Sequence, residues 1–258
     1  MQMRPSRVLK KLRSDEPVCC VKLNLSDPAA AEIAALCGVD CVWLDREHVA
    51  ADLSAIGNQI RAAKMHDVDA LVRVPRGSYS DLVHPLEMDA TGIMVPHVMG
   101  LEDARRVAWQ TRFHPIGRRP IDGGNSDGAY CMISASDYVR QANRERFVII
   151  QIEDPEPMDE LEEIAQVEGI DMLFFGPGDF SHAIGALGDM SHPRVVEARR
   201  LIPEVARRHG KFAGTVASPA TLAETIALGY QFVSVAADVV ALSETFTRAM
   251  RAFVELKL

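Results

Sequence analysis

The sequence predicts a single (β/α)8 barrel that extends over residues 1–258. Short apolar runs, which are typical of buried parallel strands, alternate eight times with segments of amphipathic helical pattern. Eight such units in a chain of 258 residues match the usual size of this barrel. An open, doubly wound parallel sheet shows the same alternation and is the rival fold.

Each predicted strand is an apolar run that is followed by its own helix, because parallel strands need a crossover connection. The strands are expected at residues 18–25, 41–45, 70–75, 92–98, 147–154, 171–177, 211–217 and 231–237. The helices are expected at residues 27–38, 53–66, 78–88, 101–113, 158–167, 193–210, 218–229 and 241–258. Residues 114–146 break the alternation and are rich in Gly and Arg. This stretch is too long for an ordinary connection, so we expect an irregular segment that is either a functional cover or disordered.

Composition excludes several classes of partner. The formal net charge of -8 and the pI near 5.5 argue against nucleic acid and anionic membranes, which need clustered positive charge. The N-terminal segment lacks the apolar core of a signal peptide, and no uncharged apolar run approaches the roughly 18 residues of a membrane span. The five cysteines are expected to be reduced thiols: Cys19, Cys20, Cys37, Cys41 and Cys131. We therefore expect a cytoplasmic protein.

Ionisable side chains gather where the predicted strands end. The first strand carries Lys22, and the second ends on Asp45, Glu47 and His48. Arg73 lies in the third strand. Since the active site of a (β/α)8 barrel lies at the C-terminal ends of its strands, we expect these side chains to converge there.

Two further strand ends carry carboxylates that are suited to a metal ion. Glu153 ends the fifth strand, and Asp179 follows the sixth in the sequence "GPGD". Two carboxylates that leave positions for water or substrate are the usual ligands of Mg²⁺ or Mn²⁺. The alternative is that Glu153 pairs with an arginine and Asp179 caps a helical turn. Gly176 and Gly178 would let backbone amides approach a bound anion closely.

The second and third strands offer groups for proton transfer and charge stabilisation. His48 beside Asp45 has the ingredients of a general base whose tautomer is fixed by a carboxylate, although a histidine in this place can also be structural. Arg73 among apolar neighbours needs an anionic partner. That partner is either a substrate carboxylate or developing enolate, or the carboxylate of Glu47 or Glu153.

The segments "VWLDREH", "LVRVP", "VIIQIED" and "FFGPGDFSHAIG" resemble one family of enzymes. They are similar to the HpcH/HpaI family, the metal-dependent class II pyruvate aldolases of the 2,4-dihydroxyhept-2-ene-1,7-dioate aldolase type. The resemblance runs over nearly the whole chain in the same order. It implies a (β/α)8 barrel that assembles into homotrimers or homohexamers, often with the last helix exchanged between subunits.

The resemblance also implies roles for individual residues. Glu153 and Asp179 match the metal ligands, Asp45 and His48 match a catalytic dyad, and Glu47 faces the metal-bound waters. Arg73 matches the arginine that stabilises the enolate. The pyruvate carboxylate would bind to backbone amides of the segment that contains Gly176, Pro177, Gly178 and Asp179. Glu87 matches an acidic residue that is donated across the subunit interface.

Lys22 departs from the family pattern, in which an aromatic or small residue is common at this place. Its positive charge near the pocket would favour an acidic or phosphorylated substrate. The segment "RRPIDGGNSDGAY" is similar to the Arg- and Gly-rich loop of the family in place but not in detail.

The activity implied by the resemblance is that of an aldehyde-lyase of the EC 4.1.2 type. A 4-hydroxy-2-oxoacid would be cleaved reversibly to pyruvate and an aldehyde through a metal-stabilised enolate, with Mg²⁺, Mn²⁺ or Co²⁺ as cofactor. Two alternatives stay open at this point. One is a citrate-lyase-like enzyme that cleaves a CoA thioester on a similar barrel, and the other is a non-catalytic protein that binds an oxoacid.

Overall fold

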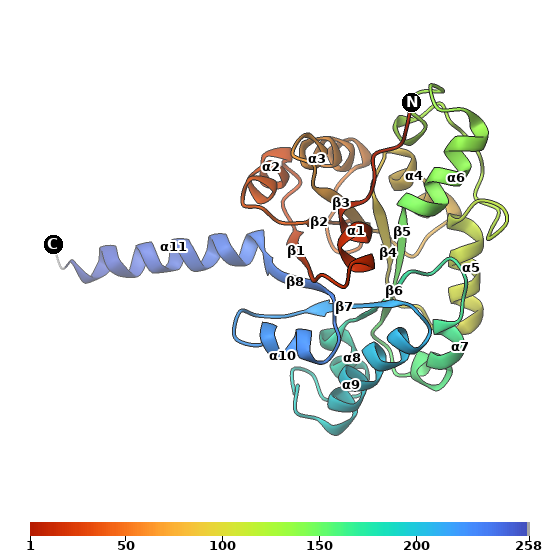
Figure 1. The fold of residues 1–258 in the computed structure, drawn as a ribbon. Helices are drawn as coiled ribbons and strands as arrows, with labels where there is room; N and C mark the ends of the chain where they lie inside the picture. The colour runs from red at the N-terminus through yellow and green to blue at the C-terminus, as the bar shows by residue number, and fades with distance from the viewer. Residues whose placement is uncertain (257–258) are drawn as a thin grey trace.

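Eight parallel strands form a closed barrel in the computed structural model, which describes residues 1–256. Each strand pairs with the next along the chain, and the last pairs with the first (Figure 1). Closure confirms the (β/α)8 fold and rules out the open sheet. The strands are β1 (Val18–Leu23), β2 (Cys41–Asp45), β3 (Asp69–Arg73), β4 (Gly92–Val95), β5 (Phe147–Ile152), β6 (Met172–Phe175), β7 (Phe212–Val216) and β8 (Phe232–Ala237).

Helices surround the barrel at the places where the sequence predicts them. They are α2 (Pro28–Leu36), α3 (Leu53–Met65), α4 (Tyr79–Glu87), α5 (Leu101–Thr111), α7 (Leu161–Ala165), α9 (Pro193–Arg208) and α10 (Leu222–Ala227). A short helix α8 (Pro177–Ala183) follows β6, and a 3₁₀ turn, η2 (Glu156–Glu160), precedes α7. Side chains that point outward from the strands, such as Val42, Ile93 and Leu173, form the core beneath this helical layer.

A helix that the sequence pattern did not predict, α1 (Arg7–Arg13), closes the N-terminal end of the barrel. Its buried Val8, Leu9 and Leu12 join the same hydrophobic cluster as side chains inside the barrel. The Val8 amide donates to Asp69 Oδ2 at 2.9 Å, at the first residue of β3. Because α1 covers the beginnings of the strands, access to the barrel is from their C-terminal ends.

Residues 114–146 are irregular only in part, so the expectation of an irregular segment is wrong for their C-terminal third. They contain a 3₁₀ turn, η1 (Ser126–Gly128), and the helix α6 (Ala135–Glu145). Tyr138 is buried in α6 and packs edge to face against Phe113, with ring centroids 5.2 Å apart. The Met3 amide donates to Gln141 Oε1 at 2.8 Å, which ties α6 to the N-terminal segment. Helical periodicity in residues 135–145 is strong enough to bury one face, and the Gly- and Arg-rich residues before it obscured this signal.

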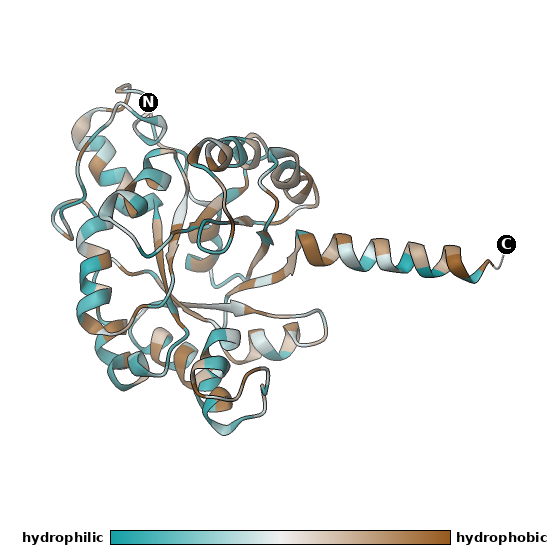
Figure 2. Cartoon of the chain, turned by 180° about the vertical axis from the view of Figure 1, so that it is seen from behind, coloured by the Kyte–Doolittle hydropathy of each residue, from teal (hydrophilic) through white to brown (hydrophobic). Residues whose placement is uncertain are grey.

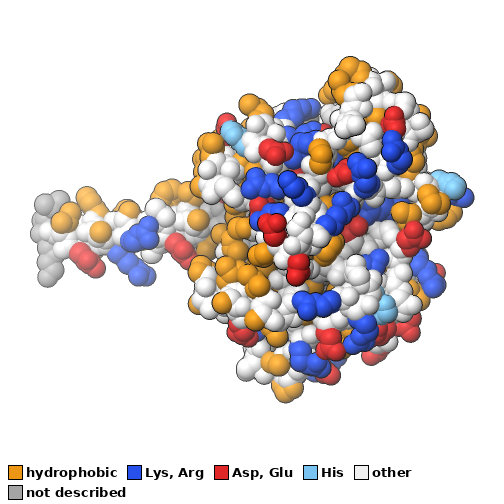
Figure 3. All heavy atoms as spheres, viewed as in Figure 1, with side chains coloured by type: hydrophobic (Ala, Val, Ile, Leu, Met, Phe, Trp, Pro, Cys, Tyr) orange, Lys and Arg blue, Asp and Glu red, His pale blue; other side chains and the backbone are white. Residues whose placement is uncertain are grey.

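The C-terminal helix α11 (Asp238–Glu255) projects away from the barrel and contains no buried residue (Figure 1). Hydrophobic residues recur along it (Figure 2), and apolar side chains lie on its surface (Figure 3). They include the exposed Leu242, Phe246, Met250 and Phe253. Residues 257 and 258 of the predicted helix lie outside the described residues. Among residues 1–256, no helix combines the length and the apolar character that a membrane crossing requires. All five cysteines are free thiols, as predicted.

Candidate active site

Asp45 lies at the centre of the ionic contacts at the C-terminal mouth of the barrel. It ends β2, directly paired with Arg73 of β3, and is 1% exposed. Arg73 Nε donates to Asp45 Oδ1 at 3.0 Å and Arg73 Nη2 to Oδ2 at 2.5 Å. Lys22 Nζ lies 2.9 Å from Oδ2. Burial opposes ionisation, but the hydrogen bonds and charges of Arg73 and Lys22 outweigh it and hold the pKa of Asp45 well below its usual range.

Arg73 bridges two carboxylates, because its Nη1 also lies 2.9 Å from Glu47 Oε2. Its guanidinium is stacked over the Trp43 ring at 4.9 Å from the centroid, and the residue is 4% exposed. Of the two internal partners weighed from the sequence, Glu47 is therefore the one that Arg73 contacts. A buried guanidinium held on two sides in this way is a fixed positive charge that points into the barrel mouth.

His48 lies in the turn after β2, and its contacts differ from the expected Asp45–His48 dyad. The His48 backbone amide donates to Asp45 Oδ1 at 3.4 Å, while its imidazole is 58% exposed. The ring Nε2 lies 3.6 Å from Glu47 Oε2, so Glu47 is the carboxylate near the imidazole. Across residues 1–256, the side-chain partners of Asp45 are Arg73 and Lys22, which occupy the oxygens that the imidazole would need.

His97 is a functional candidate that the sequence pattern did not single out. It follows β4 in a left-handed conformation with φ of 47°, and its amide donates to Glu153 Oε1 at 2.9 Å. Its Nδ1 lies 2.8 Å from Asp154 Oδ2, and its Nε2 lies 3.7 Å from Glu47 Oε1. Partial burial lowers the pKa of His97, but the hydrogen bond to Asp154 and the charges of Glu153 and Glu47 raise it overall. The sequence signal that could have identified His97 is the presence of a His and an Asp, His97 and Asp154, at the ends of two adjacent strands.

Glu153 is a carboxylate buried beyond the end of β5, with 1% exposure. Its Oε2 accepts from Gln151 Nε2 at 2.6 Å. Burial raises the pKa of Glu153 to about 7, with hydrogen bonding by His97 opposing the shift and the charges of Asp179 and Glu47 adding to it. Gly176 is necessary here, because a Cβ at that position would lie 2.5 Å from Glu153 Oε2.

Asp179 lies in the first turn of α8, next to the end of β6. Pro177 occupies the first helical position, and Gly176 precedes it at the N-cap. Ser181 Oγ donates to the Gly178 carbonyl at 2.8 Å and fixes this turn. The amides of Gly178 and Asp179 belong to the first helical turn and have no partner within the helix. Asp179 itself is exposed, in contrast to the buried Glu153.

The donors at this mouth fit a hard divalent cation. Glu153 and Asp179 supply carboxylate oxygens from adjacent strand ends, and their mutual repulsion contributes to the raised pKa of Glu153. A divalent cation between them would remove that repulsion, since it favours the charged form of both groups. No cluster of three or more His, Cys, Asp or Glu side chains able to hold a metal ion occurs among residues 1–256. The two carboxylates would therefore hold the ion together with water and substrate, as is usual for Mg²⁺.

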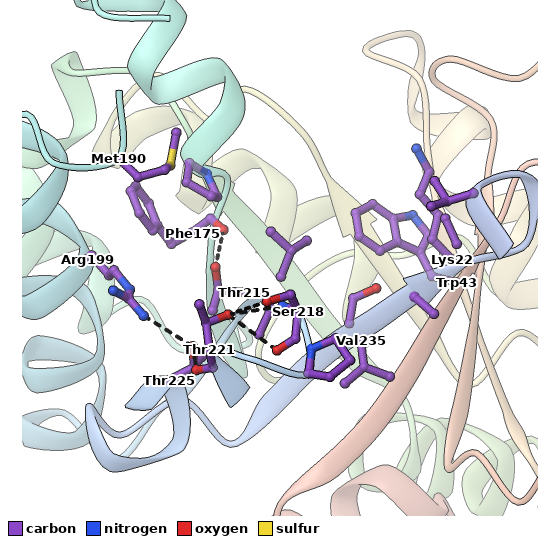
Figure 4. Close-up of a pocket in the computed structure, with 18 of the residues that line it drawn as sticks. Lys22, Trp43, Phe175, Met190, Arg199, Thr215, Ser218, Thr221, Thr225 and Val235 are labelled. Atoms are coloured by element: carbon purple, nitrogen blue, oxygen red, sulfur yellow. Dashed lines mark hydrogen bonds between the residues drawn. The ribbon is translucent and has the colours of Figure 1, made fainter. Parts of the chain in front are cut away.

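A cavity of about 760 Å³ opens beside these groups (Figure 4). Lys22 and Trp43 lie at one end, and Phe175 and Pro177 connect it to the first turn of α8. The rest of the wall comes from β7, β8 and the segments that follow them, together with Met190, Val195 and Arg199 in and before α9, and it is largely apolar. The cavity thus extends from Lys22 to Pro177, the first residue of α8.

Glu87 lies far from these residues in its own chain. It is the last residue of α4, and helices of a (β/α)8 barrel run back toward the beginnings of the strands. Burial raises the pKa of Glu87, while the charge of nearby Arg119 lowers it and that of Asp127 raises it. Any role of Glu87 at an active site therefore requires a second copy of the chain.

The fold and the site together define a barrel enzyme, since ionisable side chains from several strand ends meet at the C-terminal mouth. The chain belongs to the HpcH/HpaI aldolase/citrate lyase family, whose family model matches residues 20–245. It is accordingly an enzyme of the aldolase and lyase type, as the sequence predicted.

Named relatives agree with this assignment. The chain is 32% identical over 239 residues to a hydroxypyruvate/pyruvate aldolase of Pseudomonas aeruginosa. The matched residues cover 92% of this chain and 89% of that protein. It is 33% identical to a 5-keto-4-deoxy-D-glucarate aldolase of Shigella dysenteriae, with 83% of each chain covered. The structure of an HpcH/HpaI aldolase/citrate lyase family protein from Burkholderia cenocepacia has a TM-score of 0.89 at 31% identity, covering 96% of this chain and 99% of that one. Membership in this family and the donor set together support a divalent metal ion.

Proposed function

We propose that this protein is a metal-dependent pyruvate aldolase, which reversibly cleaves a 4-hydroxy-2-oxoacid to pyruvate and an aldehyde. The observation that carries the proposal is the buried carboxylate of Glu153, which lies near the charge of Asp179 and beside the contacts of Arg73 with Glu47. The names of the Pseudomonas and Shigella relatives, which are aldolases, support it.

Glu153 and Asp179 are the residues that would hold the divalent ion, Mg²⁺ or Mn²⁺ with Co²⁺ as a substitute. The bound ion supplies Lewis-acid stabilisation of the negative charge that develops on the keto oxygen of pyruvate. Gln151 and the His97 amide orient Glu153, because each donates to a different oxygen of its carboxylate.

Arg73 provides a second, fixed positive charge for the same developing oxyanion. Its guanidinium cannot turn away, since Asp45 and Glu47 hold it on two sides. Asp45 stays ionised at every physiological pH, because its pKa lies far below the usual range. The amides of Gly178 and Asp179 would receive the carboxylate of pyruvate.

His48 would move the proton. In the direction of synthesis it takes a proton from the methyl carbon of pyruvate, and the electron pair of that C–H bond passes into the enolate. The enolate carbon then forms the new C–C bond with the aldehyde carbon, and the aldehyde oxygen receives the proton back. Since Asp45 does not contact the imidazole, Glu47 at 3.6 Å is the carboxylate that would support the imidazolium.

The active form would be a homotrimer or homohexamer in which α11 of one copy packs on another. No residue of α11 is fully buried by its own chain, although Phe246, Met250 and Phe253 are large and apolar. Such a surface needs a partner in water. Assembly would also allow Glu87 to reach the mouth of a neighbouring barrel.

The test is deuterium exchange at the methyl group of pyruvate in D₂O, followed by NMR. We expect exchange with Mg²⁺ or Mn²⁺, no exchange with excess chelator, and loss of exchange in His48→Ala. His66→Ala is the matched control, because His66 caps α3 and pairs with Glu32 outside the site. Absence of exchange in the wild type with every metal would overturn the proposal. In that case a CoA titration identifies a thioester lyase, and pyruvate binding without exchange identifies a binding protein.

A further inference from the structure

Lys22 has donors that its own chain does not use. Its single ion-pair partner in the described part of the chain is Asp45, at 2.9 Å, whereas an ammonium group has three N–H donors. The side chain is 23% exposed, and its Nζ lies 5.4 Å from the centroid of the Trp43 ring. The indole face therefore helps to position Lys22, which lines the cavity.

Asp45 does not depend on Lys22 for its hydrogen bonds. A carboxylate offers about four lone-pair sites. Without Lys22, Oδ1 still accepts from Arg73 Nε and from the backbone amides of Glu47 and His48, and Oδ2 still accepts from Arg73 Nη2. Lys22 is the second donor to Oδ2, and each oxygen keeps at least one donor when Lys22 moves away. It can turn toward a ligand without leaving a buried oxygen unpaired.

Among the described residues that line the cavity, Lys22 is the cation that can bind an anionic ligand. Besides Lys22, its charged lining residues within residues 1–256 are Arg199 and Glu244. Arg199 Nη1 donates to Glu224 at 2.8 Å, so its charge is already compensated, and Glu244 carries the wrong sign. The walls between Lys22 and α8 include the apolar Trp43, Phe175 and Pro177. Figure 4 shows Lys22 beside Trp43 at one end of the cavity, with Phe175 and Thr215 farther along it.

We propose that Lys22 determines the acceptor specificity of the enzyme by binding an anionic group on the aldehyde. This rests on the proposed aldolase function. With pyruvate placed between α8 and Arg73, the aldehyde carbonyl lies toward the enolate carbon and the rest of the acceptor extends along the cavity. The preferred acceptor therefore bears a carboxylate or a phosphate away from its carbonyl group. Both anions are recognised by the same charge-assisted hydrogen bonds from Lys22.

The experiment compares matched acceptors with pyruvate as donor. Succinic semialdehyde is paired with butanal, and glyceraldehyde 3-phosphate with glyceraldehyde. The quantity measured is the ratio of kcat/KM for the anionic acceptor to that for its neutral partner. We expect Lys22→Met, which keeps the length of the side chain, to lower this ratio about tenfold or more. Lys22→Arg should keep most of it. Lys10→Met is the matched control, since Lys10 is an exposed residue of α1 at the closed end of the barrel.

Each outcome decides between distinct interpretations. The pair with the larger wild-type ratio identifies the anion as carboxylate or phosphate. An equal loss of kcat/KM with charged and neutral acceptors in Lys22→Met would show that Lys22 acts only through Asp45, and would overturn the proposal. A wild type that exchanges pyruvate protons but prefers neither anionic acceptor would overturn it as well. Absence of pyruvate exchange in the wild type is a separate result, which refutes the aldolase function itself.

Discussion

Replacing Glu153 by glutamine should stabilise the folded protein in the absence of metal, although most substitutions of buried residues are destabilising. Without metal, burial disfavours the ionised form of the Glu153 side chain. It raises the pKa of Glu153 from 4.5 to about 7 in the folded protein. The folded state thus retains a proton that the unfolded chain releases between these two pH values. Stability is unaffected below about pH 4.5, falls as the pH rises through this window, and stays low above pH 7.

The size of this effect follows from the shift in pKa. Ionised Glu153 costs the metal-free folded protein about 3 kcal/mol at about pH 8. Glutamine removes that cost and fits the same hydrogen bonds. Its carbonyl can accept from the His97 amide, and its NH₂ can donate to Gln151 Oε1, which is buried without a partner. This second contact requires only that the Gln151 amide turn over.

Urea unfolding of both proteins in chelator, between about pH 4.5 and pH 8 at one protein concentration, measures the difference. We expect Glu153→Gln to gain stability relative to wild type as the pH rises, by up to about 3 kcal/mol. Saturating Mg²⁺ should reverse the order, because only the wild type gains binding energy from the ion. Glu16→Gln, an exposed site before β1, is the matched control. Parallel stability curves for wild type and Glu153→Gln would refute the reasoning.

Three further predictions concern neighbouring features. Arg73→Lys should lower kcat/KM about 100-fold or more, because an ammonium group cannot replace the guanidinium between Asp45 and Glu47; turnover near that of wild type would remove Arg73 from the mechanism. Gly176→Ala should weaken Mg²⁺ binding in calorimetry, since the added Cβ would displace the Glu153 carboxylate. Gly123→Ala is the control and should not weaken it, because a Cβ there meets nothing within 4 Å. Equal Mg²⁺ affinities of wild type and Gly176→Ala would contradict this packing argument. Phe246→Glu should dissociate the oligomer in light scattering, and an unchanged mass would show that α11 does not form the interface.

The periodicity of the sequence predicted the barrel because every strand and its crossover helix contribute a local signal. Residues 41–45 are apolar up to Asp45, and the helix that follows β2 has the amphipathic spacing that covers one face of a sheet. The sequence did not predict α1, since seven residues with four basic side chains resemble a solvated segment. Only the tertiary structure shows that Val8, Leu9 and Leu12 are buried against the strand beginnings.

The sequence predicted which strand ends meet at the site. It did not predict which side chains contact one another there. Asp45 and His48 are three residues apart, and proximity in sequence suggested their contact. In the structure, Arg73 of the neighbouring strand competes for the same oxygens with two donors and a full charge, so it displaces the imidazole. His97 was missed for the complementary reason. Its partners Asp154 and Glu153 lie more than fifty residues away and become neighbours only through the pairing of β4 with β5.

The carboxylates of Asp45 and Glu153, on two sides of the barrel mouth, differ in how their negative charge is compensated. This difference indicates a different role for each residue. Asp45 is saturated with donors and keeps its charge without any ligand, so its task is to fix Arg73 and tolerate movement of Lys22. Glu153 is equally buried but has only an amide and a carboxamide as donors, and its pKa shows that this is insufficient. A buried carboxylate with so few donors destabilises the folded protein unless a cation compensates its negative charge. We therefore propose that the cation lies beside Glu153, while Arg73 faces the developing oxyanion and Lys22 faces the anionic group of the acceptor.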